Sequence, residues 1–222
     1  MLVCVVIPAY QAGERIGRVL DGIASFVPPQ ATIVVDDGSR DGTAEEARQR
    51  GVRVLSHARN QGKGAAHETG FREALSLGCE AVLTLDADGQ HDPREIPKFL
   101  EAWSQRESEI LVGSRWGTLA AMPLLRRLVN RTTSVVVSLL AGQRVEDSQS
   151  GYRLISSEVL SRIFLRTKRY QTESELLIKS GRAGFAIQSV PIQAHYAGEK
   201  SFINPLLDTL RFMGVALAGL WR

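Results

Sequence analysis

The sequence predicts an α/β fold with a mostly parallel central sheet and helices on both faces. Short apolar runs alternate with stretches in which apolar residues recur at helical spacing, the order typical of parallel strands joined by helices. The apolar runs are continuous rather than alternating, as expected for strands that are covered on both faces. In open sheets of this kind, ligands bind beyond the carboxyl ends of the strands.

Each predicted strand is a short apolar run bounded by residues typical of turns. The first strand begins at Leu2 and ends where Pro8 interrupts the run. The predicted strands are Leu2–Ile7, Thr32–Val35, Val52–Leu55, Ala81–Leu85 and Ile110–Val112.

Helices are predicted between these strands and after the last one. In the first helix, apolar residues at positions 16, 19, 20 and 23 share one face. Pro93 suits a first helical turn because the N–H that it lacks would have no partner there. The predicted helices are Glu14–Ser25, Thr43–Arg50, Lys63–Leu77, Pro93–Trp103 and Leu124–Ala141.

Length, composition and charge fit one globular domain. A chain of 222 residues with 44% hydrophobic residues can bury a sizeable core. The net charge is +3 and the basic residues are dispersed, so nothing indicates nucleic acid as a partner. Anionic phosphates or a membrane surface would both fit this charge.

The cysteines and the amino terminus favour a cytoplasmic protein. Cys4 and Cys79 lie in apolar segments without a CxxC motif or a partner pair of histidines, so we expect two reduced core thiols and no disulfide. The chain has no basic start and reaches Pro8 early, unlike a secretory signal.

The carboxyl-terminal segment, residues 204–222, is predicted to be an apolar helix in which Asp208 and Arg211 carry the charges before the last residue. One alternative is packing on the core or in a homodimer. The other is a position in the membrane interface. No run in the sequence reaches the roughly 18 apolar residues that a spanning helix requires.

Asp86 and Asp88 directly follow the predicted fourth strand, and Gln90 follows them. Residues two apart on a strand share a face, so the two carboxylates are expected to converge on one ligand. About 4 Å apart in a partly buried site they would repel by roughly 4 kcal/mol, and a hard divalent cation turns that repulsion into coordination. The pattern predicts a Mg²⁺ or Mn²⁺ ion that carries a diphosphate.

Polar clusters follow all of the predicted strands. A single Asp-Gly or Gly-Lys-Gly sequence is usually only a turn, but their coincidence at successive strand ends indicates one ligand crevice. The clusters are Pro8-Ala9-Tyr10, Asp36-Asp37-Gly38-Ser39, Asn60-Gln61-Gly62-Lys63-Gly64, Asp86-Ala87-Asp88-Gly89-Gln90 and Gly113-Ser114-Arg115.

The succession of motifs resembles the family 2 glycosyltransferases, which have the GT-A fold. It is most similar to the dolichol-phosphate mannosyltransferase-like branch, which acts on polyprenyl phosphates. The resemblance covers residues 3–212 and implies transfer of a sugar from a nucleotide diphosphate donor with inversion at the anomeric carbon. The motifs are VVIPAY, VVDDGSRDGT, NQGKGAA, LDADGQH, GSR, DSQSGYR and ESELLIKSGRAGF.

The resemblance also implies a donor site. Asp37 can supply hydrogen-bond acceptors to a nucleoside, and Tyr10 a flat packing surface. The alternative for Asp36 to Ser39 is a turn that caps the helix beginning near Thr43. The residues assigned to the donor nucleotide are Pro8, Tyr10, Val35, Asp37, Asp86, Ala87 and Lys200.

The same resemblance implies that Asp86, Asp88 and Gln90 hold the divalent ion, with Asp88 as the first choice for a direct ligand. The ion then stabilises the leaving diphosphate as a Lewis acid. Arg115 follows the fifth strand, where a guanidinium can form paired hydrogen bonds to phosphate oxygens. We predict Asp88, Arg115 and Asp147 as catalytic residues.

Arg126 and Asn130 lie four residues apart and share one face of a helix. The resemblance implies that they bind the acceptor phosphate, with Asn130 at a position where relatives carry Ser. For each arginine of this helix, a solvated surface position is the alternative. A phosphate monoester is already anionic near neutral pH, so positioning rather than a strong general base would dominate the rate.

A hydroxyl acceptor would need a carboxylate to take its proton, and Asp147, Glu173 and Glu175 are the candidates. The structural alternatives are a turn for Asp147 and an i,i+4 pair with Lys179 for Glu175. Lys63 lies between two glycines at a helix start but lacks the Walker spacing. We predict that it is structural or close to the donor.

The prediction is a single catalytic domain at residues 1–203, with a donor-nucleotide half at 1–115 and an acceptor half at 116–203. It transfers a hexose from a GDP- or UDP-sugar to a polyprenyl phosphate, peripherally bound at the cytoplasmic face of the membrane. The first alternative is a saccharide or other hydroxyl acceptor in cell-envelope synthesis. An alternative of another class is a non-catalytic nucleotide-binding scaffold. A homodimer or a membrane-protein partner is left open.

Overall fold

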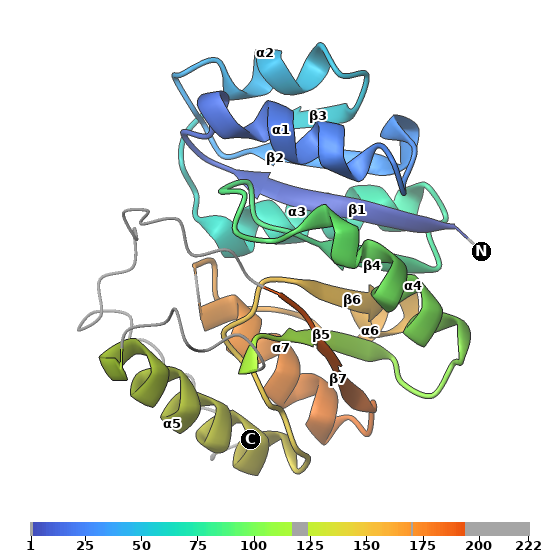
Figure 1. Ribbon diagram of the computed structural model, residues 1–222, viewed down its shortest axis with the longest axis vertical. Coiled ribbons are helices and arrows are strands. Elements are labelled where there is room, and N and C mark those ends of the chain that lie inside the picture. Colours follow the sequence, from blue (N-terminus) through green and yellow to red (C-terminus); the bar gives the residue numbers. More distant parts are fainter. Residues whose placement is uncertain (1, 117–123, 170, 194–222) are drawn as a thin grey trace.

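The computed structural model describes residues 2–116, 124–169 and 171–193, which form a seven-stranded sheet covered by helices (Figure 1). The order of the strands is β3-β2-β1-β4-β6-β5-β7. β6 is antiparallel to β4 and β5, and the other pairings are parallel. The predicted fold class is therefore confirmed. The strands are β1 (Val3–Ala9), β2 (Thr32–Asp36), β3 (Arg53–Ser56), β4 (Ala81–Thr84), β5 (Ile110–Ser114), β6 (Arg153–Ser156) and β7 (Ile187–Pro191).

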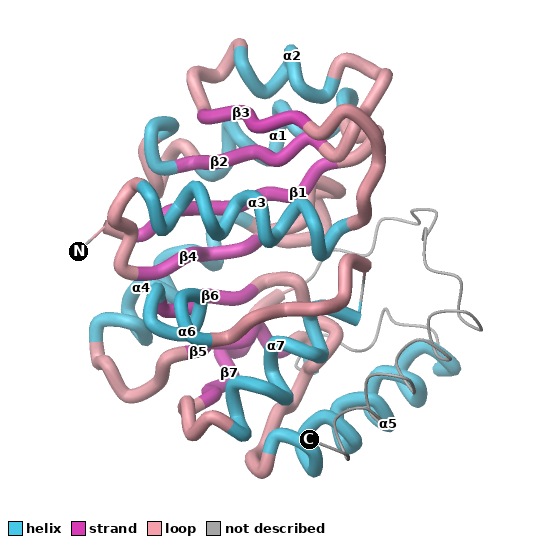
Figure 2. The backbone as a smooth tube through the Cα atoms, turned by 180° about the vertical axis from the view of Figure 1, so that it is seen from behind, coloured by secondary structure: helices cyan, strands magenta, loops and turns pink. Residues whose placement is uncertain are grey.

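Helices cover both faces of this sheet. α1 and α4 lie on one face, and α3, α6 and α7 lie on the other (Figure 2). α5 packs on α7 at the β7 end of the molecule. The helices are α1 (Gly13–Ile23), α2 (Thr43–Arg48), α3 (Lys63–Ser76), α4 (Ile96–Ser104), α5 (Leu124–Ala141), α6 (Ser157–Arg162) and α7 (Gln171–Arg182), with 3₁₀ helices at Pro29–Ala31 and Pro93–Glu95.

The core follows the continuous apolar runs. Every residue of β1, β2, β4 and β5 is buried, because strands sandwiched between helices have no face in water. β3 lies at the edge of the sheet, and its residues are half-buried or exposed. The five predicted strands are all present, with ends that differ by one or two residues.

Four of the five predicted helices begin or end elsewhere: the bounds of α1 and α3 differ by one or two residues, and those of α2 and α4 differ for a visible reason. α2 stops at Arg48, before Gly51, which has a positive φ of 70° that a helix does not continue through. Pro93 starts a 3₁₀ turn rather than an α-helix, and the Asp92 carboxylate accepts a hydrogen bond from the backbone of Arg94 at 2.9 Å. α4 therefore begins only at Ile96.

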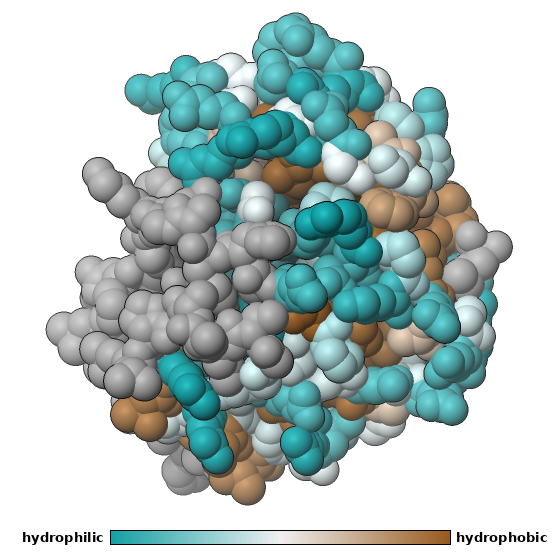
Figure 3. Space-filling view, viewed as in Figure 1, coloured by the Kyte–Doolittle hydropathy of each residue, from teal (hydrophilic) through white to brown (hydrophobic). Residues whose placement is uncertain are grey.

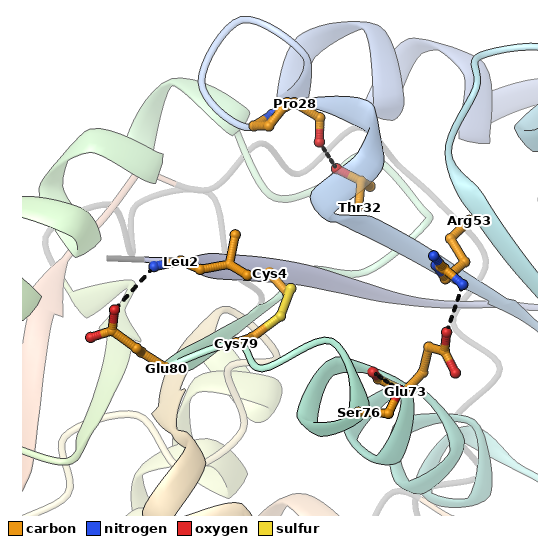
Figure 4. The surroundings of a disulfide bond; sticks show 9 residues. All are labelled: Leu2, Cys4, Pro28, Thr32, Arg53, Glu73, Ser76, Cys79 and Glu80. Carbon is orange, nitrogen blue, oxygen red and sulfur yellow. Dashed lines mark hydrogen bonds and ion pairs between the residues drawn. A yellow bond between two sulfur atoms is a disulfide. The ribbon is translucent and has the colours of Figure 1, made fainter.

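The expectation of two reduced thiols is wrong, because Cys4 and Cys79 form a disulfide (Figure 4). They are 75 residues apart in sequence, but β1 and β4 pair in parallel, with Val3 opposite Ala81. Cys79, which lies just before β4, therefore comes within 5.9 Å of Cys4 between Cα atoms. The sequence pattern could not predict this disulfide, because strand pairing rather than a short cysteine motif brings the two residues together.

Some predictions lie outside the described residues. These are Lys200, the helix at 204–222 and the side chain of Arg126, although Arg126 belongs to α5. Among the helices that the structure describes, none has the length and apolar character needed to cross a membrane.

Candidate active site

The carboxyl ends of β1, β2, β3, β4 and β5 point to one edge of the sheet. The first four strands are parallel neighbours. β5 runs in the same direction because both β4 and β5 are antiparallel to β6. The polar clusters that follow these strands therefore share one edge, as expected for a ligand crevice.

The loop after β4 holds the acidic pair. Asp88 Oδ1 accepts a hydrogen bond from the backbone of Gln90 at 2.9 Å, and the backbone of Asp86 donates to His91 Nδ1 at 3.2 Å. Gly89 between them has a positive φ of 79°, which closes the turn. Burial, and then the negative charge of Asp86, raises the pKa of Asp88 above its ordinary value.

The donor set of this loop fits a hard divalent cation. Carboxylate and side-chain amide oxygens are the ligands that Mg²⁺ and Mn²⁺ prefer. A nearby positive charge would also offset the burial that disfavours ionised Asp88. Across the described residues, no group of three or more His, Cys, Asp and Glu side chains could enclose a metal. Such an ion would therefore rely on substrate phosphates and water for its other ligands.

Asp86 is held by an ion pair. Lys63 Nζ, at the start of α3, lies 2.6 Å from Asp86 Oδ1 and 2.7 Å from Glu173 Oε1 of α7. Burial acts to raise the pKa of Asp86, but Lys63 and other neighbours outweigh burial and lower it. The same balance lowers the pKa of Glu173. The prediction that Lys63 is structural or close to the donor stays a prediction, but its ammonium binds two carboxylates.

Two of the three predicted catalytic residues bind each other. Arg115 donates from Nε and Nη2 to the two oxygens of Asp147 at 2.7 and 2.8 Å, and both side chains are buried. The two N–H groups of Arg115 that we expected to donate to a phosphate therefore donate to Asp147. The neighbouring Arg153 is fully buried, and its guanidinium donates to the carbonyls of Ser148 and Ser150, and to a third in α7.

The residues predicted to bind the donor nucleoside lie in or directly after β1 and β2, and that role stays a prediction. Pro8 and Val35 are opposite each other in β1 and β2, and both are buried. Tyr10, at the end of β1, is 44% exposed and so available for stacking. The Asp37 carboxylate accepts hydrogen bonds at 2.7 to 2.9 Å from His57 Nδ1 and from the backbone of Gln61 and Gly62.

The alternative interpretation of residues 36–39 as a helix cap is not borne out. Asp36 Oδ1 accepts a hydrogen bond from the backbone of Ser39, which forms a turn. The N-cap position of α2 is Gly42, and it is Asp41 that accepts from the backbone and hydroxyl of Thr43. Asp41 also accepts from the backbone of Gly13, so it joins the starts of α1 and α2.

α5 has the bounds that the sequence predicts, and Asn130 is half-buried on it. One turn further, the hydroxyl of the buried Ser134 accepts a hydrogen bond from the backbone of Ser148 at 3.0 Å. α5 is thereby joined to the turn that carries Asp147. A site for an acceptor phosphate at Arg126 and Asn130 stays a prediction.

The sequence interpretation missed the contacts that connect these motifs. Lys63 and Glu173 were singled out separately, but their ion pair depends on the packing of α3 against α7. Arg153 ends the DSQSGYR motif, and its burial was not foreseen. A charged residue next to an apolar run, as in Arg153-Leu154-Ile155, was the available signal.

The sheet and the acidic loop at its carboxyl edge define a nucleotide-diphospho-sugar transferase fold of the GT-A type. The structure is similar to that of glucosyl-3-phosphoglycerate synthase from Mycobacterium tuberculosis in complex with UDP, with a TM-score of 0.76 and 24% identity, covering 98% of this chain and 79% of that one. The model of glycosyl transferase family 2 matches residues 4–167, and the chain belongs to this family.

Sequence similarity to curated relatives extends over most of the chain. It is 35% identical over 217 residues to a UDP-N-acetylglucosamine–dolichyl-phosphate N-acetylglucosaminyltransferase of Methanococcus voltae, which covers 88% of this chain and 86% of the relative. It is 32% identical over 203 residues to an undecaprenyl-phosphate mannosyltransferase of Micrococcus luteus, with 86% and 83% covered. The chain is therefore a sugar-transferring enzyme.

Proposed function

We propose that this enzyme transfers a hexose from a GDP- or UDP-sugar to a polyprenyl phosphate, with inversion and with Mg²⁺ or Mn²⁺. An oxygen of the acceptor phosphate attacks the anomeric carbon while the bond from that carbon to the donor's phosphate oxygen breaks. The nucleoside diphosphate leaves with the electron pair. Asp86, Asp88 and Gln90 are the residues that would hold the ion, which when bound neutralises charge on the leaving diphosphate.

The observation that carries this proposal is that the carboxylates a hydroxyl acceptor would need as bases are already bound. Asp147 binds Arg115 through both oxygens. Glu173 pairs with Lys63. Glu175 accepts hydrogen bonds from two backbone N–H groups and a threonine hydroxyl, and pairs with a lysine. Burial acts to raise the pKa of Glu173 and Glu175, but their donors outweigh burial and lower it, which makes both carboxylates weaker bases.

An anionic acceptor removes the need for such a base. A phosphate oxygen is nucleophilic without loss of a proton, so catalysis reduces to positioning and charge stabilisation. The named acceptors of the two curated relatives, dolichyl phosphate and undecaprenyl phosphate, support the same acceptor class for this chain.

The outer face of α5 supports peripheral binding to a membrane surface. Leu128, Val135 and Leu139 are exposed along one side of the helix, and Leu139 is 77% exposed. Arg127 and Arg131 are exposed beside them, and α5 contains no acidic residue. Apolar side chains are visible at this end of the molecule (Figure 3). An apolar stripe with flanking arginines suits an anionic lipid surface.

Transfer assays test the acceptor. Labelled GDP- and UDP-sugars are incubated with short polyprenyl phosphates, with and without Mn²⁺, and the matched control is the same polyprenol without its phosphate. We expect a glycolipid product only with the phosphate and the metal. Tight nucleotide binding without transfer from any donor would reject the lipid acceptor.

Base variants separate this proposal from a hydroxyl acceptor. If alanine at Asp147, Glu173 or Glu175 abolished transfer while donor binding stayed intact, a hydroxyl acceptor would be favoured. A thermal-shift screen of GDP- and UDP-sugars identifies the nucleotide, because a ligand that binds only the folded state raises its apparent stability.

A further inference from the structure

Lys63 is the first residue of α3, and its side chain is only 16% exposed. A lysine between two glycines at the start of a helix has the composition of a phosphate-binding loop. Its ammonium instead lies 2.6 Å from Asp86 Oδ1 and 2.7 Å from Glu173 Oε1. The lysine therefore bridges the loop after β4 to α7.

The glycines beside Lys63 serve this bridge by letting α7 approach. Gly62 has a positive φ of 101°. A Cβ on Gly64 would fall 2.7 Å from the carbonyl carbon of Lys168 and 2.9 Å from Thr172 Cβ. Close packing against the segment that leads into α7 accounts for both glycines, and it brings Glu173 to the ammonium of Lys63.

A third glycine fixes the direction of Asp86. A Cβ on Gly151 would fall 2.8 Å from Asp86 Oδ2, 3.0 Å from Asp86 Oδ1 and 3.1 Å from Lys63 Nζ. Both carboxylate oxygens of Asp86 therefore lie over Gly151, on the side where Lys63 binds. Asp88, two residues on, accepts a backbone hydrogen bond through Oδ1 and is half-buried at the same edge.

We propose that Lys63 is a positioning residue, which holds the Asp86 carboxylate in place for the metal-bound donor and does not itself contact the donor phosphates. This inference rests on the proposed function. Two neighbouring carboxylates repel, and an unrestrained Asp86 would turn away from Asp88. Lys63 removes that freedom, so the acidic pair has a fixed geometry before the cation arrives. Supporting residues of this kind typically change metal affinity when they are removed.

Calorimetric titration of UDP and GDP, each with and without Mn²⁺, tests the proposal. Lys63→Met removes the ammonium but keeps an unbranched chain. Lys63→Met/Glu173→Gln removes the ammonium and one carboxylate together, so the net charge of the cluster of Lys63, Asp86 and Glu173 is unchanged. The matched control is Lys179→Met, because Lys179 Nζ pairs with Glu175 on the same helix at 2.6 Å, away from the acidic loop.

We expect both Lys63 variants to weaken binding of the Mn²⁺–nucleotide complex by about tenfold or more. The affinity of the Lys63 variants for metal-free nucleotide should stay within about twofold of that of the unaltered protein. Lys179→Met should keep its affinity for both metal-free nucleotide and the Mn²⁺–nucleotide complex within the same range. In an Asp86→Asn background, Lys63→Met should cause no further loss, because Lys63 acts through that carboxylate.

Three results overturn the proposal. Equal weakening of metal-free and Mn²⁺-bound nucleotide would show direct contact of Lys63 with phosphate. Unchanged Mn²⁺–nucleotide affinity would show that Lys63 positions nothing. If circular dichroism showed that both Lys63 variants fail to fold, the lysine would have a purely structural role. Absence of nucleotide binding to the unaltered protein is a separate outcome, which overturns the proposed function and this inference with it.

Discussion

Two buried polar clusters, one in each half of the sheet, are bound in different ways. After β2, in the β3-β2-β1-β4 half, the Asp37 carboxylate accepts hydrogen bonds from the backbone of Gln61 and Gly62 in a neighbouring loop. After β5, in the β6-β5-β7 half, the buried side chains of Arg115 and Asp147 bind each other as an ion pair. The first arrangement fixes the path of loops, and the second fixes whole elements against each other.

This difference matters for stability because a backbone N–H that loses its acceptor is neutral, whereas an arginine that loses its carboxylate leaves a buried charge. An uncompensated buried charge costs more than an unsatisfied amide. We therefore expect the Arg115–Asp147 pair to respond more strongly to loss of one polar partner than the cluster around Asp37.

The largest effect is expected for Asp147→Asn. The substitution leaves Arg115 buried beside a neutral amide, and removal of one partner of a buried ion pair typically costs about 3–5 kcal/mol. Urea unfolding followed by circular dichroism measures the loss in free energy of unfolding.

The control for Asp147→Asn removes both partners. Arg115→Met/Asp147→Leu keeps similar volume without a charge, and replacing a whole buried pair by apolar residues is often neutral. A double variant that is less stable than Asp147→Asn would contradict the view that the loss of stability comes from removing the carboxylate partner of the buried Arg115 charge.

The second effect is loss of the disulfide, the covalent link within the β3-β2-β1-β4 half. A cross-link between residues 75 apart restricts the unfolded chain, and such a bond is worth about 2–4 kcal/mol. We expect dithiothreitol to lower the urea midpoint of the unaltered protein. Cys4→Ala/Cys79→Ala should start at the lower midpoint and show no response. An identical midpoint with and without the reductant would refute the link.

Asp37→Asn should have a smaller effect than either. The amide keeps one acceptor oxygen for three donors, His57 Nδ1 and the backbone N–H groups of Gln61 and Gly62. A buried donor without a partner costs about 1–3 kcal/mol. Urea unfolding is again the measurement, and a loss as large as that of Asp147→Asn would remove the proposed distinction between the two halves.

Features that depend on local sequence could be predicted, whereas contacts between distant elements could not. β1 and β4 were predicted because a continuous apolar run reports a strand buried on both faces, whatever its tertiary neighbours. The acidic loop was predicted because Asp86 and Asp88 directly follow such a run. Local pattern is sufficient there because local sequence determines both the strand and the position of its end.

Contacts between distant elements were not predictable in this way. β6 is four residues long and begins with Arg153, whose burial depends on carbonyl groups supplied by the preceding turn and by α7. Nothing in the local pattern reveals those acceptors. The disulfide was missed for a related reason, since the register of β1 against β4 brings its cysteines together.

The smallest effect is expected for Arg72→Met, which tests whether burial rather than the kind of ion pair separates the two halves. Arg72 pairs with Glu68 on α3 at 3.1 Å, the same chemistry as Arg115 with Asp147, but the Arg72 side chain is 75% exposed. Exposed i,i+4 pairs contribute about 0.3–0.5 kcal/mol, so we expect Arg72→Met to lose about that much free energy of unfolding.

Salt separates the exposed pair from the buried one. The loss of stability in Arg72→Met should vanish in about 1 M NaCl, where the Debye length falls to roughly 3 Å. The loss for Asp147→Asn should persist in that salt, because dissolved ions screen a buried pair much less than an exposed one. Urea unfolding of both variants at low and high salt measures the contrast, and a salt-resistant loss at Arg72 equal to that at Asp147 would show that exposure does not set the energy of these pairs.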